Sequence, residues 1–263
     1  MYNITYRKKL NDETILCDVR NQDEFIEVVK SISPDVIINC IGILIEGANV
    51  DPENAIFINA YFPHRLMSLA NKLNSKLIHI STDCVFSGEK EMPYIEEDFK
   101  DGKDIYAKSK GLGEIINENH LTLRTSVIGP EIKTDGEELF HWFMSQSDDI
   151  NGYTGAIWSG VTTMILAKTV CWAIEEKITG LYHVTNNTSI NKYDLLNLIR
   201  KYTKKEIDII PVLGKESDKS FIDTRKQIDF TIPSYDKMIK EMVELMGNKK
   251  RLYSQYFKIN NKQ

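Results

Sequence analysis

The sequence predicts an α/β protein: a Rossmann-like, doubly wound parallel sheet with a smaller α/β lobe towards the C-terminus. Two observations support this fold class. Short β-rich runs alternate with helical patterns through the first half of the chain. These runs are almost continuously apolar, as in VIINC at 36–40, which is typical of parallel strands covered on both faces. The pattern changes after Asn187, so we assign 1–135 and 156–187 to the sheet domain and 136–155 and 188–263 to the smaller lobe.

The expected strands and helices follow one another in a clear order. Asn21 precedes the first helical pattern as a capping residue, and Pro52 stands at the start of the second, where its missing N–H is tolerated. The charged tail contains Lys249-Lys250-Arg251, which we interpret as a solvated helix end. Strands are expected at 3–6, 14–18, 35–40, 76–81, 121–127, 180–184 and 207–210, and helices at 22–32, 54–73, 106–117, 162–176 and 192–201.

Composition excludes several classes of protein. The chain has 263 residues, 42% of them hydrophobic, and 33 basic against 38 acidic side chains. Such a balance is typical of a globular protein and disfavours binding to nucleic acid, which usually requires a basic surface. The longest apolar stretch, 36–45, is shorter than the ~20 residues of a membrane span. The first residues contain no apolar run of the kind found in signal peptides, so none is expected. The four cysteines lack zinc-binding spacing. We therefore expect a cytoplasmic protein with reduced thiols, no metal and no membrane partner.

One motif carries acid–base chemistry. Tyr106 and Lys110 have the Y-x-x-x-K spacing, so one helical turn separates them and both side chains can face one cleft. A nearby ammonium favours the phenolate and makes the tyrosine a usable acid or base. The spacing alone is weak support, because a tyrosine on a helix surface can produce it by chance.

The preceding strand strengthens this interpretation. The run 76–81 is followed by Thr82 and Asp83, at the carboxyl end of a strand, where ligands bind in such folds. Thr82 can donate a hydrogen bond to a carbonyl while Tyr106 supplies the proton. Asp83 has a second explanation, since it could simply cap the turn.

Three segments together resemble a known family. The chain is similar to the extended short-chain dehydrogenases/reductases, and within them to the dTDP-4-dehydrorhamnose reductase-like group of nucleotide-sugar reductases. The resemblance runs from about residue 2 to about residue 242. It is carried by IHISTDCVFSG, DIYAKSKGLGE and LTLRTSVIGPE.

The resemblance implies roles for individual residues. Tyr106, Lys110 and Thr82 match the catalytic trio, and the expected cofactor is NADPH, with NADH as an alternative. Arg7 and Lys8 would then hold the 2′-phosphate, although a solvated basic turn would look the same. The implied substrate residues are Asp83, Val85, Trp158, Lys219 and Arg225. The implied cofactor residues are Arg7, Lys8, Asp18, Val19, Cys40, Ile41, Gly42, Asn59, Ser81, Tyr106 and Lys110.

The beginning of the sequence departs from the family pattern. The first glycine is Gly42, so the Gly-rich turn that cradles a cofactor pyrophosphate is not found before it. The first strand of the family, which lies in the centre of the sheet, also has no counterpart. A start recorded too late, re-pairing of the sheet, or degeneration would each explain this, and energetics favours the first. We expect the chain as given to bind dinucleotide poorly and to associate through unpaired strand edges.

Three functions follow from these features. The first is NADPH-dependent reduction of a nucleotide-linked 4-keto-6-deoxyhexose for surface polysaccharide synthesis, including dTDP-rhamnose biosynthesis. The second is epimerisation of a nucleotide sugar; dehydration is disfavoured because Asp83 is the one carboxylate in the Thr82–Cys84 segment. The third is a non-catalytic role, like that of the regulatory subunit of methionine adenosyltransferase, which has a similar fold. The base, the hexose and the oligomeric state, a homodimer among the options, stay open.

Overall fold

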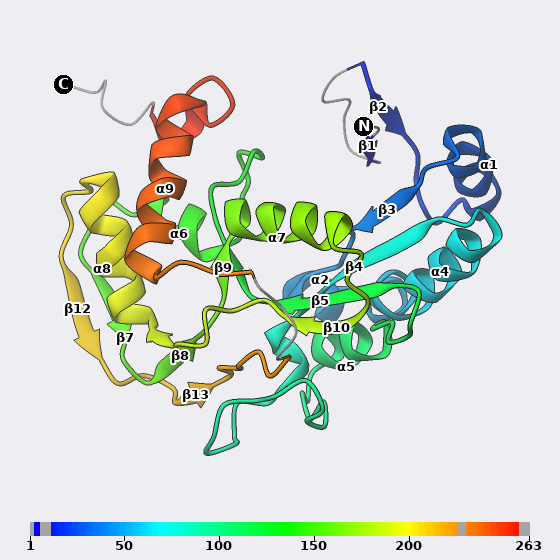
Figure 1. Ribbon diagram of the computed structural model, residues 1–263. Coiled ribbons are helices and arrows are strands. Elements are labelled where there is room, and N and C mark those ends of the chain that lie inside the picture. Colours follow the sequence, from blue (N-terminus) through cyan, green and yellow to red (C-terminus); the bar gives the residue numbers. More distant parts are fainter. Residues whose placement is uncertain (1–2, 6–11, 226–229, 258–263) are drawn as a thin grey trace.

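The centre of the molecule is a four-stranded parallel sheet (Figure 1). The computed structural model describes residues 3–5, 12–225 and 230–257. The strand order is β10–β5–β4–β3, with every pair parallel. This confirms the predicted α/β fold class with a parallel, Rossmann-like sheet. The strands are β3 (Val36–Asn39), β4 (Lys76–Thr82), β5 (Leu121–Thr125) and β10 (Gly180–His183).

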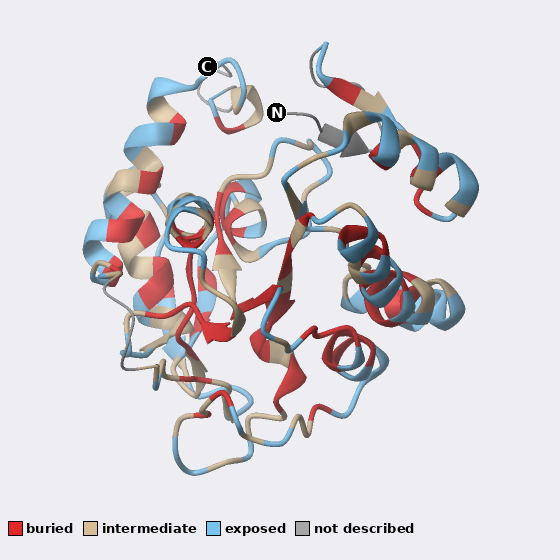
Figure 2. Cartoon of the chain, turned by 45° about the vertical axis from the view of Figure 1, so that its right-hand side comes forward, coloured by how far each residue is buried: buried red, intermediate tan, exposed pale blue. Residues whose placement is uncertain are grey.

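Helices cover both faces of this sheet, as the apolar strands require. Leu77 packs in one cluster with Phe62 and Leu66 of α4 (Phe62–Lys72). The neighbouring Ile78 points to the opposite face and shares a cluster with residues of α7 (Thr163–Glu175). Alternate side chains of β4 therefore serve opposite layers, because successive strand residues face opposite ways. Figure 2 shows the central strands as mainly buried and the outer helix surfaces as exposed.

The N-terminal strands form a separate pair. β1 (Asn3–Thr5) and β2 (Thr14–Leu16) are parallel to each other. Within the described ranges neither strand pairs with β3, which is the edge strand of the central sheet. α1 (Gln22–Ile32) connects this pair to the rest by placing Phe25 edge-on against Phe62, with ring centroids 5.3 Å apart. Re-pairing of the sheet, one of the three explanations above, is thus not seen in the described part of the chain.

The second predicted helix is divided into several pieces. α2 (Ile45–Val50) and α3 (Pro52–Ala55) precede a π-helix, η1 (Ile56–Tyr61), which runs into α4. Pro52 stands in the first turn of α3, as its missing N–H predicts, and the Asp51 carboxylate accepts a hydrogen bond from Asn54 N. The π-helix was not expected from the pattern, because the 3.6-residue periodicity of the flanking segments conceals it.

The helix that carries Tyr106 is shorter than predicted. α5 spans Ile105–Leu112 rather than 106–117. Asp104 caps its N-terminus by accepting a hydrogen bond from Ala107 N at 2.7 Å. Beyond Leu112 the chain turns so that the Ile115 backbone exchanges two hydrogen bonds with the buried Thr122 hydroxyl, at 2.7 and 3.0 Å. This anchoring to β5 replaces the last helical turn.

A second lobe is built from short strands and two longer helices. α8 (Lys192–Thr203) and α9 (Tyr235–Asn248) pack together at the C-terminal side. α8 agrees with the helix expected at 192–201. The interpretation of the residues after 210 as a charged tail was wrong, because Tyr235, Met238 and Met242 of α9 are buried. The remaining elements are η2 (Asp83–Val85), β6 (Val127–Ile128), α6 (Leu139–Ser145), β7 (Ile150–Tyr153), β8 (Ala156–Trp158), β9 (Val161–Thr162), β11 (Ile190–Asn191), β12 (Ile209–Val212), β13 (Ser217–Asp218) and η3 (Ser254–Tyr256).

One hydrophobic cluster connects the two lobes. Ile78 and Leu121 of the central sheet belong to the same cluster as Leu195 of α8 and Met242 of α9. The lobes therefore share a core, and the boundaries near 135, 156 and 187 stay a prediction. None of the helices in the described ranges is long and apolar enough to cross a bilayer.

Candidate active site

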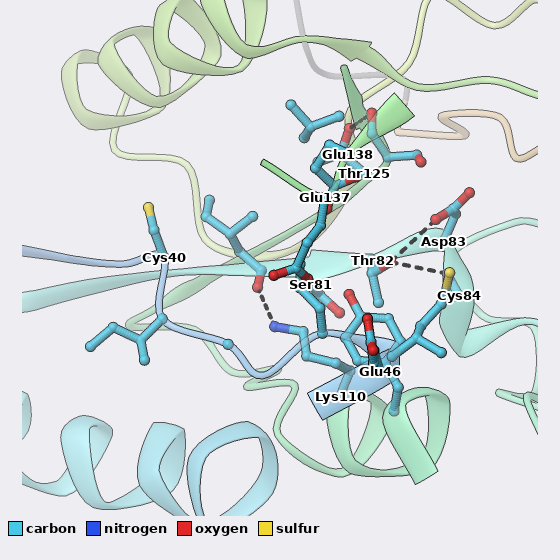
Figure 3. Close-up of a pocket in the computed structure, with 18 of the residues that line it drawn as sticks. Cys40, Glu46, Ser81, Thr82, Asp83, Cys84, Lys110, Thr125, Glu137 and Glu138 are labelled. Carbon is cyan, nitrogen blue, oxygen red and sulfur yellow. Dashed lines mark hydrogen bonds between the residues drawn. The ribbon is translucent and has the colours of Figure 1, made fainter. Parts of the chain in front are cut away.

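A cavity of about 800 Å³ opens at the carboxyl ends of β3, β4 and β5 (Figure 3). This is the edge of the sheet at which parallel α/β folds bind ligands. The side chains around it come from the loop after β3, the start of α5, the segment after β5 and the approach to α6. Eight residues predicted from the sequence line it together: Cys40, Ile41, Gly42, Ser81, Thr82, Asp83, Tyr106 and Lys110.

Tyr106 lies in the first turn of α5 and is buried. Burial raises the pKa of its phenol above the ordinary value, and the negative charges of Cys84 and Asp83 raise it further. A hydrogen bond with Thr82 acts in the opposite direction. The ligand-free site therefore holds Tyr106 in its protonated form, ready to give a proton rather than to take one.

Lys110 lies one helical turn further along and is also buried. Its Nζ donates a hydrogen bond to the Ile80 carbonyl at 2.8 Å, which ties α5 to β4. Burial lowers the pKa of Lys110 to about 8, while the charges of Glu114 and Cys40 oppose that change. The ammonium is thus charged at neutral pH and close to its titration point.

Thr82 is the last residue of β4, and its hydroxyl faces the cavity edge. It accepts a hydrogen bond from Cys84 N at 3.1 Å and donates to the Asp83 carboxylate at 3.2 Å. Burial raises the pKa of Asp83, whereas Lys219 and Lys192 act to lower it. Figure 3 shows Thr82, Asp83 and Cys84 grouped at one end of the cavity, with Lys110 below Ser81.

Asn59 shapes the cavity from behind. Its side chain accepts a hydrogen bond from Ile43 N at 2.8 Å and donates to Ile43 O at 2.9 Å and to Ser109 at 3.2 Å. It therefore holds the loop after β3 against α5 instead of lining the cavity. A Cβ at Gly42 would lie 3.5 Å from the Asn59 side-chain oxygen and 3.9 Å from Lys110 Nζ, so this loop passes close to the lysine.

Beneath the site lies a buried ion pair that the sequence did not reveal. Arg124 in β5 donates to both carboxylate oxygens of Glu114, at 2.7 and 2.8 Å. Glu114 also accepts from Ser81 at 2.7 Å, and a third Arg124 nitrogen lies 2.7 Å from His183 Nε2. Burial and the Arg124 charge lower the pKa of His183 to about 4, so this imidazole is neutral and accepts the bond. The network supports β4 and β5 directly below the Thr82 edge.

Several predicted site residues lie elsewhere. Asp18 pairs with Arg20 on the surface, 2.5 Å away, which lowers the pKa of its carboxyl. Arg225 donates hydrogen bonds to the carbonyls of Thr179 and Leu181, both at 2.9 Å, so its guanidinium stabilises β10. Val19, Val85 and Trp158 do not line the cavity, because they are buried in hydrophobic clusters. Lys219 is not among the lining residues either. Arg7 and Lys8 lie outside the described residues.

The sequence interpretation missed several polar residues around the cavity. Glu138 precedes α6 at the cavity edge, and its position at a helix start was the available signal. Lys192 begins α8 and does not line the cavity, but the charges of Asp83, Cys84 and Glu138 act on it. Glu46, Glu131 and Glu137 also line the cavity. In the described ranges no cluster of histidine, cysteine and carboxylate side chains could hold a metal ion.

Comparison with known proteins gives a consistent family assignment. Residues 8–246 match the family model described as RmlD substrate binding domain. The dTDP-4-dehydrorhamnose reductase of Escherichia coli is 26% identical over 198 residues, covering 72% of this chain. That of Salmonella typhimurium is 23% identical, covering 87% of this chain and 85% of the relative. The chain spans 66% of the length of the E. coli protein and of the Bacillus subtilis spore coat polysaccharide biosynthesis protein SpsK.

Solved structures share the fold. The dTDP-4-dehydrorhamnose reductase of Bacillus anthracis, crystallised in complex with NADP, superposes with a TM-score of 0.78 at 22% identity and covers 88% of each chain. The orthologue from Clostridium acetobutylicum gives a TM-score of 0.76 at 24% identity, covering 91% of this chain and 92% of that one. At these identities the structural likeness establishes the fold.

Proposed function

Because this chain belongs to the RmlD substrate binding domain family, we propose that it reduces the keto group of a nucleotide-linked 4-keto-6-deoxyhexose with NADPH. The observation that carries the proposal is the convergence of Tyr106, Lys110 and Thr82 on one cavity at the strand ends. Relatives named dTDP-4-dehydrorhamnose reductase support the substrate class. The spore coat polysaccharide relative supports a role in making surface polysaccharide.

The residues around the cavity fit one half of the proposed cofactor. Lys110 Nζ and the glycine loop at Gly42 stand side by side, which suits a ribose hydroxyl next to a close-approaching backbone. When bound, the reduced nicotinamide supplies the hydride. We assign the nicotinamide ribose to Lys110 and Tyr106, and the adenosine end to Arg7 and Lys8. In this proposal, residues 1–135 and 156–187 bind the cofactor, and the smaller lobe of 136–155 and 188–263 binds the substrate.

The chain's own residues then perform the acid–base part of the reaction. Tyr106 Oη gives its proton to the substrate keto oxygen as that oxygen becomes an alcohol. Thr82 Oγ1 turns from the Asp83 carboxylate to donate a hydrogen bond to the same oxygen, which stabilises its developing charge. Lys110 keeps a positive charge near Tyr106 and so lowers the cost of the phenolate that remains.

The assay separates the proposed function from its alternatives. NADPH binding by the full chain is measured first by fluorescence, because the sequence predicts weak binding of the dinucleotide. At a saturating NADPH concentration the chain is then mixed with dTDP-4-keto-6-deoxyglucose, and the loss of NADPH absorbance and the product mass are followed together. We expect one NADPH consumed for each keto sugar reduced. An epimerase would change the sugar without net consumption of NADPH, and a non-catalytic subunit would change neither. Either result would contradict the reductase proposal.

A further inference from the structure

The end of the chain packs against one wall of the cavity. The loop between β6 and α6, residues 129–138, forms this wall, which we call the α6-side wall. Its cavity-lining members are Gly129, Pro130, Glu131, Glu137 and Glu138. η3 (Ser254–Tyr256), which we call the C-terminal turn, reaches this loop from 125 residues further along the chain. Tyr256 is buried there and shares a hydrophobic cluster with Phe140 of α6.

Two side chains of the C-terminal turn hold the backbone of Glu131. Tyr256 Oη accepts a hydrogen bond from Glu131 N at 3.0 Å. Gln255 Nε2 donates a hydrogen bond to the Glu131 carbonyl at 2.5 Å. Glu131 lies outside the helices and strands, so its backbone groups need other partners when they leave water. The C-terminal turn supplies a partner for both groups and thereby fixes Glu131 in place.

Tyr256 also holds the far end of the α6-side wall. Its hydroxyl lies 3.0 Å from His141 Nδ1, which is within hydrogen-bonding distance. Its ring packs edge-on against the rings of Phe140 and His141, with centroids 5.5 Å apart in each case. Both residues belong to α6, which begins directly after the wall. One side chain therefore connects the first part of the wall to the helix that follows it.

Glu131 passes this constraint on to the cavity. One of its carboxylate oxygens accepts a hydrogen bond from Glu138 N at 2.9 Å, and the other lies 3.4 Å from Lys133 Nζ. The loop has little room to rearrange, because a Cβ at Gly136 would come within 2.6 Å of the Glu131 carboxylate and 2.5 Å of the His141 ring. A displacement of Glu131 would therefore move Glu138, and with it the surface that faces the cavity.

We propose that Gln255 and Tyr256 are positioning residues that fix the α6-side wall for binding of the nucleotide sugar. This rests on the proposed function, because it takes the ligand of the cavity to be a nucleotide sugar. Neither side chain lines the cavity, so both act through Glu131. A wall that is fixed before the ligand arrives loses less conformational freedom on binding, which raises the affinity. The proposed proton transfer takes place on the sheet side, so the C-terminal turn should affect binding more than the chemical step.

The first measurement needs no ligand. Hydrogen–deuterium exchange compares the wild-type chain with Tyr256→Phe and with Gln255→Met, which each remove hydrogen bonds and keep most of the side-chain volume. We expect the amides of 129–138 to exchange about 3- to 10-fold faster in each variant, as for the loss of one hydrogen bond, and those of β4 and β5 to exchange as before. Tyr253→Phe is the matched control, because the Tyr253 hydroxyl forms no hydrogen bond with any residue that the structure describes.

The second measurement separates binding from chemistry. Calorimetry with dTDP-glucose, which has no keto group to reduce, gives the affinity of the cavity for a nucleotide sugar. Steady-state rates with dTDP-4-keto-6-deoxyglucose at saturating NADPH give kcat and KM. We expect Tyr256→Phe and Gln255→Met to weaken dTDP-glucose binding and to raise KM about 3- to 10-fold, while kcat stays close to wild type. A variant that was merely less stable would bind normally at temperatures where it is folded.

The outcomes separate this inference from the proposed reaction. Unchanged exchange at 129–138 in both variants would overturn it, and so would faster exchange with unchanged dTDP-glucose affinity. A fall in kcat at constant KM would overturn it as well, because the turn would then act on the chemical step. If Tyr256→Phe unfolds, Gln255→Met gives the same comparison. If the wild-type chain binds dTDP-glucose but consumes no NADPH, the reductase proposal fails, and the exchange and binding comparisons still decide this inference.

Discussion

The two sides of the cavity are built in opposite ways. On the sheet side, Lys110 is tied to the Ile80 carbonyl and Thr82 to its neighbours, above the Glu114–Arg124 pair. On the opposite side, Glu131, Glu137 and Glu138 line the cavity before α6, and burial together with the charge of Glu131 raises the pKa of Glu138. Groups that are already satisfied keep a fixed geometry, which proton transfer requires. The sheet side therefore fits the proposed proton transfer, whereas the α6 side contributes negative charge to the cavity.

The largest expected effect comes from removing the proposed proton donor, Tyr106, from the sheet side. Tyr106→Phe keeps the ring in place but deletes the hydroxyl, so kcat should fall by about 10²–10⁴-fold. Binding of dTDP should be unchanged, because the substitution removes one hydroxyl and keeps the ring. Steady-state rates with NADPH and calorimetry with dTDP measure the two quantities. Tyr61→Phe on the exposed surface serves as the control. A Tyr106→Phe variant with wild-type kcat would show that another group gives the proton.

The next effect concerns the support beneath the sheet side. Glu114→Ala leaves the Arg124 guanidinium buried without its carboxylate, which typically costs about 3–5 kcal/mol of unfolding free energy. Urea unfolding monitored by circular dichroism measures this. The double variant Glu114→Met with Arg124→Met should be more stable than Glu114→Ala, because it removes both charges. A Glu114→Ala protein within 1 kcal/mol of wild type, a threshold of roughly one surface ion pair, would contradict a central role for this network.

A third effect gives stability a pH dependence. Burial lowers the pKa of Lys110 from 10.5 to about 8, so between those values the unfolded chain binds a proton that the folded protein does not. The unfolding free energy therefore rises with pH across that window. Below pH 8 the folded protein carries the full destabilisation that comes from holding a charged Lys110 in a buried site. The size is on the order of 3 kcal/mol. Unfolding of Lys110→Met, compared with wild type at pH 7 and 10, should show a smaller rise. An identical rise would exclude Lys110 as its source.

The smallest expected effect concerns the N-terminal cap of α5, the helix that carries Tyr106. Asp104→Ala removes the acceptor for Ala107 N, and loss of such a cap costs about 0.5–2 kcal/mol. Asp104→Asn should recover most of the stability, since an amide oxygen caps equally well. Thermal unfolding of the three proteins gives the ranking. If Asp104→Ala and Asp104→Asn lose the same amount, the carboxylate charge matters rather than the cap.

The sheet-side wall could be predicted from the sequence for a physical reason. Tyr106 and Lys110 are related by one helical turn, and Thr82 by its place at the end of an apolar strand, so local periodicity already determines where they point. The sequence pattern also gave the four central strands. The Glu114–Arg124 ion pair could not be predicted from this pattern, because the two residues belong to different segments of the chain and each by itself resembles an ordinary surface charge.

Residues of the second lobe were harder to place. Trp158 and Arg225 were expected to contact substrate, yet the ring of Trp158 packs 5.7 Å from that of Tyr235, and Arg225 bonds to β10. Short strands and loops carry these residues, so no repeating period fixes the direction of their side chains. The resemblance to a family indicated the fold of this lobe better than the orientation of individual side chains.

The π-helix η1 has a consequence for how this chain tolerates insertions and deletions. A π turn accommodates one more residue than an α turn over the same length, so deleting a single residue between Ile56 and Tyr61 would turn the segment into continuous α-helix. The side chains before the deletion would then rotate by about 100° relative to α4. Asn59 would leave Ile43, and the loop that carries Gly42 would lose its clamp to α5. The number of residues in η1 therefore determines where Asn59 points and how the Gly42 loop is held at the candidate site.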